Sequence, residues 1–84
     1  MKARVYVTLK PSILDPQGKT ITSALHTLGY EAVRDVRQGK YFELDVDAPT
    51  GEQAQSLAGD VADRLLANPV IESYRVEVDG DAGD

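Results

Sequence analysis

The strongest constraint on the fold is a pattern that occurs twice: an extended segment, a helical stripe and a second extended segment. In residues 4–10 (RVYVTLK), Val5, Val7 and Leu9 alternate with polar side chains. This period of two is typical of a half-buried strand. The same reasoning predicts four strands in all, over residues 4–10, 31–37, 41–46 and 70–78.

Two helices are predicted between these strands. Asp15 and Pro16 form a typical helix start, an N-cap followed by proline at the first helical position. Gly29 is placed to end this helix. Thr50 and Gln53 have the spacing of a capping box for the second helix. Apolar residues recur at helical spacing in both segments, at Ile21, Ala24, Leu25 and Leu28, and at Ala54, Leu57, Ala58, Val61, Leu65 and Leu66.

The element order βαββαβ predicts an α+β fold, a ferredoxin-like two-layer sandwich. Right-handed crossovers give a four-stranded antiparallel sheet, in the order 4-1-3-2, with both helices on one face. The second strand fits least well, because Val33 and Val36 are three residues apart. Either a bulge lies near Arg34 and Asp35, or Val36 pairs with Tyr41 on the outer face. We expect a single domain over residues 1–79 and a flexible acidic tail over 80–84.

Composition narrows the classes of function. The 84 residues contain no cysteine, so disulfides and thiolate metal sites are excluded. No apolar run approaches the roughly 18 residues of a membrane span, and the first ten residues do not resemble a signal peptide. These points favour the cytoplasm. The net charge is −5, and without Asp79, Asp81 and Asp84 it is −5 + 3 = −2. Nucleic-acid binding therefore has no electrostatic support.

Three loops are predicted to meet at one end of the sheet. They comprise residues 10–18, 37–40 and 67–70, and their apolar and basic side chains make that end a candidate contact surface. For Ile13 and Leu14, burial as a local plug under the first helix is the alternative to exposure. The partner-binding candidates, called the rim here, are Lys10, Ile13, Leu14, Arg37, Lys40 and Asn68.

Residues with catalytic chemistry are sparse. His26 is the single histidine of the sequence, and we expect it to be a solvated helix residue. Gly18, Lys19 and Thr20 resemble the end of a phosphate-binding loop, but the glycine spacing of that motif is absent. No serine lies beside a histidine. We therefore expect no catalytic residue, no cofactor and no metal site.

Several linked motifs give a family resemblance. LK, LDPQG, LG, VRQGK and LLANPVIE follow one another in order, beginning at Leu9, Leu14, Leu28, Val36 and Leu65. This series resembles the PurS subunit of phosphoribosylformylglycinamidine (FGAM) synthase, over nearly the whole chain except the tail.

The resemblance implies a non-catalytic role in de novo purine biosynthesis. It implies a homodimer or larger homo-oligomer that bridges a large ATP-dependent synthetase subunit (PurL) and a glutaminase subunit (PurQ), and that supports ammonia transfer between them. The isolated chain is expected to be inactive.

Two other functions compete with this one. An amino-acid-sensing βαββαβ module would also pair and bind small molecules, although it usually has a glycine-rich turn where this chain has Pro11 to Pro16. A nucleic-acid-binding domain would use stacking aromatics such as Tyr6 and Tyr41, but Glu43 and Glu77 share their predicted face.

Overall fold

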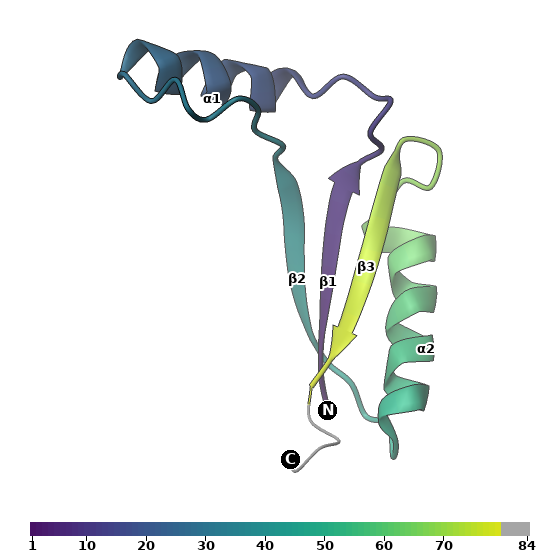
Figure 1. Ribbon diagram of the computed structural model, residues 1–84. Coiled ribbons are helices and arrows are strands. Elements are labelled where there is room, and N and C mark those ends of the chain that lie inside the picture. The colour runs from purple at the N-terminus through teal and green to yellow at the C-terminus, as the bar shows by residue number, and fades with distance from the viewer. Residues whose placement is uncertain (80–84) are drawn as a thin grey trace.

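The computed structural model describes residues 1–79, so the predicted acidic tail, 80–84, lies outside the described residues. Its elements are β1 (Lys2–Leu9), α1 (Pro16–Thr27), β2 (Gly39–Asp45), α2 (Gly51–Val61), the π-helical turn η1 (Ala62–Leu66) and β3 (Glu72–Val78). The strands form an antiparallel sheet in the order β2-β1-β3 (Figure 1). The α+β class and the antiparallel pairing are confirmed.

The core lies between the sheet and α2. In the central strand, Val5 and Val7 are fully buried, with Phe42 and Val76 paired on either side of Val5. The helix α2 packs against β3 and β1. Small side chains let it lie close to the sheet, since the buried hydrophobic residues are Ala3, Val5, Val7, Val46, Ala54, Ala58, Ala62 and Ala67.

The predicted helix ends are confirmed. Asp15 is the N-cap of α1 and accepts from the Gly18 N–H, while Thr50 is the N-cap of α2 and accepts from the Gln53 N–H. Gly29 has a φ of 99°, a left-handed conformation that other residues adopt only at a cost. Local capping chemistry therefore sets these boundaries.

The predicted strand over residues 31–37 was wrong, because the sheet has three strands and this segment joins none of them. The chain instead runs back beside α1 (Figure 1). The His26 Nε2 atom lies 2.8 Å from the Val33 carbonyl oxygen, and the Val33 N–H donates to Tyr30. Contacts to the preceding helix replace a strand ladder, so neither the predicted bulge nor the predicted pairing of Val36 with Tyr41 occurs.

The prediction that both helices cover one face holds only for α2. The helix α1 and the returning segment, together called the α1 arm (residues 16–38), project past the sheet edge at β2 (Figure 1). The radius of gyration is 16.2 Å, with extents of 49 × 30 × 15 Å, whereas a compact domain of this length has a radius near 12 Å. The sequence predicts the apolar stripe of α1, but it does not show which residues cover that stripe.

Within residues 1–79, neither helix has the length and apolar character that crossing a bilayer requires.

Candidate functional site

Arg37 joins the first two predicted loops. Its Nη2 donates to the carbonyl oxygens of Leu9 at 2.8 Å and Lys10 at 2.9 Å. Its Nη1 also lies within hydrogen-bond range of the Ile13 carbonyl, at 3.4 Å. The planar guanidinium suits this fork of acceptors. Arg37 therefore holds the loop after β1 in shape, a role that its position in a turn did not reveal.

The third loop is fastened to the first through the backbone. The Lys10 N–H donates to the Ile71 carbonyl at 2.9 Å. Asn68 closes its own turn, because its side-chain oxygen accepts from Val70 at 3.0 Å and its carbonyl accepts from Glu72 at 2.7 Å. The structure thus brings the predicted rim loops to one end of the sheet, with Asn68 serving the turn itself.

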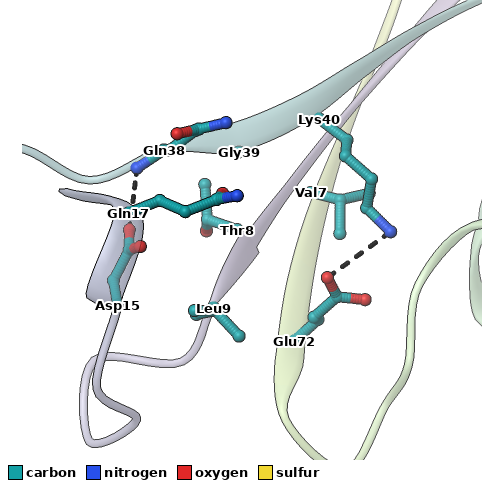
Figure 2. A pocket seen from close by; sticks show the side chains of 9 residues that line it. All are labelled: Val7, Thr8, Leu9, Asp15, Gln17, Gln38, Gly39, Lys40 and Glu72. Carbon is teal, nitrogen blue, oxygen red and sulfur yellow. Dashed lines mark hydrogen bonds and ion pairs between the residues drawn. The ribbon is translucent and has the colours of Figure 1, made fainter. Parts of the chain in front are cut away.

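Lys40 and Glu72 connect β2 to the start of β3. The Lys40 Nζ lies 3.5 Å from Glu72 Oε2 (Figure 2). It also lies 3.3 Å from the Leu66 carbonyl oxygen. Glu72 Oε1 accepts from the Asn68 N–H at 2.7 Å. Glu72 is the last residue of the motif LLANPVIE, but the sequence did not reveal this role. The only available signal was its place just after the Asn68 turn.

Asp15 joins the start of α1 to the segment before β2. Its buried carboxylate accepts from the Gly18 N–H at 2.9 Å and from the Gln38 N–H at 2.8 Å. These two backbone donors, that of Gln38 first, hold the pKa of Asp15 below its ordinary value. The second bond spans 23 residues and goes beyond the predicted capping role.

A surface pocket of about 230 Å³ opens between these elements (Figure 2). Both of its carboxylates, Asp15 and Glu72, already accept internal hydrogen bonds, and Lys40 is paired with Glu72. These contacts suit structural roles better than general acid–base work. Within residues 1–79, no three or more His, Asp or Glu side chains are grouped to hold a metal ion.

The two apolar residues of the first loop differ in exposure. Leu14 is 68% exposed, whereas Ile13 is half-buried. The predicted alternative of a local plug therefore fits only Ile13. Leu14 is an exposed apolar side chain at the rim, and it lines a surface hollow together with the basic residues Lys19 and Arg37.

The outer sheet face carries an internally paired polar network. The rings of Tyr6 and Tyr41 lie 5.2 Å apart, and the Arg75 guanidinium sits 4.4 Å from the Tyr6 ring centre. Glu77 accepts from Tyr6 and pairs with Arg75. The pKa of Tyr41 is raised mainly by desolvation of its hydroxyl and, to a smaller extent, by its hydrogen bond to Glu43. Arg75 already stacks on Tyr6, one of the two rings that a nucleobase could use.

Similarity to known proteins identifies the family of this chain. The model of the PurS family, described as phosphoribosylformylglycinamidine (FGAM) synthase, matches residues 2–80. The chain belongs to the PurS family. This confirms the resemblance indicated by the linked motifs, and the matched residues include both the sheet and the rim loops.

Individual PurS proteins agree with this assignment. The PurS subunit of Synechocystis is 49% identical over 75 residues, which are 89% of this chain and 75% of that protein. The solved PurS of Methanocaldococcus jannaschii, a subunit of formylglycinamide ribonucleotide amidotransferase in the purine biosynthetic pathway, has a TM-score of 0.84 at 35% identity, over 93% of this chain and 94% of that chain. A chain of PurLQS from Thermotoga maritima has a TM-score of 0.84 at 32% identity, over 92% and 94%.

Proposed function

We propose that this PurS-family chain is the small, non-catalytic subunit of phosphoribosylformylglycinamidine synthase in de novo purine biosynthesis. In this role it bridges the large synthetase subunit, PurL, and the glutaminase subunit, PurQ, in the cytoplasm. The observation that carries the proposal is the similarity to a chain of Thermotoga maritima PurLQS, with a TM-score of 0.84 over 92% of this chain. Family membership favours this role over an amino-acid-sensing module.

The chemistry of the described residues supports a docking role. The pocket carboxylates and Lys40 are engaged in contacts that hold the loops together. A subunit that helps ammonia pass between two active sites needs surfaces that exclude water rather than a nucleophile. In this proposal the catalytic groups belong to the two larger subunits, and the isolated chain turns over neither glutamine nor ATP.

The rim is the proposed contact surface for the larger subunits. Four of its six residues differ in what they offer a partner. Arg37 and Asn68 shape the loops, while Leu14 presents an exposed apolar side chain and Lys40 an exposed basic one. Partner interfaces combine apolar side chains at the centre with polar and charged side chains at the edge. We therefore assign the direct contacts to Leu14 and Lys40 first.

Self-association forms part of the same proposal. Val5 and Val7 are the only fully buried large side chains among the described residues, whereas Leu14, Leu28, Tyr30, Leu65 and Val70 are each at least 60% exposed. A chain this small buries a limited core on its own. Burying further apolar area between copies, at about 25 cal/mol per Å², favours a dimer or larger assembly.

A reconstitution experiment tests the bridging role. The double variant Leu14→Ser/Lys40→Ala is combined with PurL and PurQ, and turnover is measured with glutamine and, separately, with ammonium chloride as the nitrogen source. We expect glutamine-dependent turnover to fall and ammonium-dependent turnover to persist, because only the former needs transfer between subunits. The matched control is Asp47→Ala/Glu52→Ala, two exposed residues beyond β2.

If glutamine-dependent turnover is the same with and without the wild-type chain, the proposed function is overturned. If the wild-type chain is required but the rim variant and the control variant are equally active, the contact surface lies elsewhere than the rim.

A further inference from the structure

The loop that exposes Leu14 is anchored by a segment more than 20 residues further along the chain. Leu14 is 68% exposed and belongs to no helix or strand. The residue before it, Ile13, offers its carbonyl oxygen to the Arg37 guanidinium at 3.4 Å, across 24 residues. The residue after it, Asp15, accepts the backbone N–H of Gln38 at 2.8 Å, across 23 residues. Two consecutive residues, 37 and 38, therefore anchor the chain on both sides of Leu14.

Further hydrogen bonds fix the start of the same loop. The Arg37 Nη2 donates to the carbonyl oxygens of Leu9 at 2.8 Å and Lys10 at 2.9 Å. The Lys10 N–H donates to the Ile71 carbonyl, and the Lys10 carbonyl accepts the Ile13 N–H to close a turn, each at 2.9 Å. Connecting loops are ordinarily more mobile than the elements that they join. This loop has its conformation set within the chain, before any partner docks.

The acceptors of Arg37 explain why an arginine suits this position. All three are carbonyl oxygens of neutral peptide groups, those of Leu9, Lys10 and Ile13. A planar guanidinium presents several donors in a fixed fork, whereas a lysine ammonium is a compact charge on a flexible stem. Hydrogen bonds from a charged donor are also stronger than neutral ones. The arrangement of acceptors, more than the charge, therefore favours arginine here.

We propose that Arg37 is a positioning residue for the glutamine-dependent reaction, because it orders the loop that presents Leu14 to one of the larger subunits. This inference rests on the proposed bridging of PurL and PurQ. Leu14 and Arg37 line the same surface hollow, of about 370 Å³. A mobile loop loses conformational entropy when it docks, and a loop that is already ordered avoids most of that cost. Arg37 thus acts through Leu14 and not by touching the partner itself.

A double-mutant cycle tests whether Arg37 acts through Leu14. Arg37→Lys, Leu14→Ala and the combined variant are each titrated into PurL and PurQ, and the chain concentration that gives half-maximal glutamine-dependent turnover is measured. We expect Arg37→Lys to raise this concentration about tenfold, the effect of ordering about one more residue on docking, and to leave the maximal turnover unchanged. In the Leu14→Ala background the same substitution should raise it less than about twofold, because the side chain that Arg37 positions is already gone.

The matched control is Arg64→Lys, the same chemical change at an exposed arginine of η1, which should titrate like the wild type. If the effects of Arg37→Lys and Leu14→Ala multiply in the combined variant, Arg37 acts independently of Leu14 and the inference is overturned. An Arg37→Lys chain that titrates like the wild type overturns it too, as does one that sediments differently from the wild type on its own. A wild-type chain with no influence on glutamine-dependent turnover overturns the proposed function itself.

Hydrogen exchange of the wild-type chain tests the order of the loop without any substitution. The amides of Lys10 and Ile13 donate to carbonyls of the same chain. We therefore expect both amides to be protected in the free chain and to change little when PurL and PurQ are added. Amides that exchange freely in the free chain and become protected only in the complex would show that the partner orders the loop, which is the opposite of the inference.

Discussion

The carboxylate of Asp15 accepts the backbone N–H of Gln38 at 2.8 Å, although 23 residues separate them. Its other oxygen caps α1 through Gly18. One side chain therefore fixes where α1 begins and how the chain enters β2. Protonation of this carboxylate would weaken both bonds.

Stability should fall in acid through Asp15. Its pKa is lowered in the folded state, so its contribution is complete above the unfolded pKa, near 4, and is lost as pH falls through the lower folded value. Asp79, whose pKa is lowered by the hydrogen bond from Arg4, adds to the same trend. We expect Asp15→Asn to be less stable at pH 7 and to lose less of its stability on acidification.

Urea denaturation between pH 2 and pH 7 measures this dependence. Asp47→Asn, at an exposed position, is the control and should follow the wild-type curve. If Asp15→Asn shows the wild-type slope in acid, the carboxylate of Asp15 is not the source of the pH dependence.

Gly18 should tolerate no side chain. A Cβ there would lie 2.0 Å from the Val36 carbonyl oxygen and 2.9 Å from the Asp15 carboxylate. We expect Gly18→Ala to lower the free energy of unfolding by about 1–3 kcal/mol, the typical cost of overpacking. In Gly59→Ala the added methyl meets no heavy atom within 4 Å, and alanine should stabilise α2 by about 0.5–1 kcal/mol.

Paired chemical denaturation curves check this contrast between the two glycines. Equal stabilisation of both variants would show that helix propensity, rather than the approach of Val36, governs position 18.

Arg37→Lys should loosen the loop after β1. A lysine ammonium retains the charge but lacks the fork that reaches the carbonyls of Leu9 and Lys10. We expect faster amide hydrogen exchange over residues 10–14, with exchange in α2 unchanged. Unaltered exchange in the loop would mean that these hydrogen bonds do not order it.

Glu72 should matter more as a hydrogen-bond acceptor than as a charge. Glu72→Gln retains an oxygen for the Asn68 N–H and loses the ion pair with Lys40, a change of under about 1 kcal/mol. Glu72→Ala removes the acceptor of that exposed N–H as well as the ion pair, and should cost about 0.5–1.5 kcal/mol more. Thermal unfolding compares the two variants. A larger loss for glutamine than for alanine would contradict this account.

Sequence reasoning succeeded where neighbouring residues decide the structure. The caps at Asp15 and Thr50 and the left-handed Gly29 follow from local chemistry, and each was predicted. It also placed β1 between its two partners. Alternation identifies an apolar face, and antiparallel pairing in this topology leaves few orders open.

Sequence reasoning failed where the structure depends on contacts between residues that are far apart in the sequence. The apolar stripe through Leu28 indicates that α1 will be covered, but periodicity contains no information on whether the cover is intramolecular. Residues 31–37 were assigned to a strand as part of the repeated element order, although the spacing of Val33 and Val36 fitted a strand poorly. Tethering to α1 through His26 keeps this segment from the sheet. Among the rim residues, the long-range bonds of Arg37 were equally invisible in its local sequence.

The placement of the chain start has a practical consequence for protein engineering. The Met1 ammonium group donates to the Val46 carbonyl at 2.8 Å, and Asp79 is bonded to Lys2 nearby. Both positions lie at the end of the sheet opposite the rim loops (Figure 1). An affinity tag fused to Met1 would convert that ammonium group into an amide, whereas one attached after the described residues would leave it intact. Immobilisation through the carboxyl-terminal side should therefore present the rim to solution with the fold least disturbed.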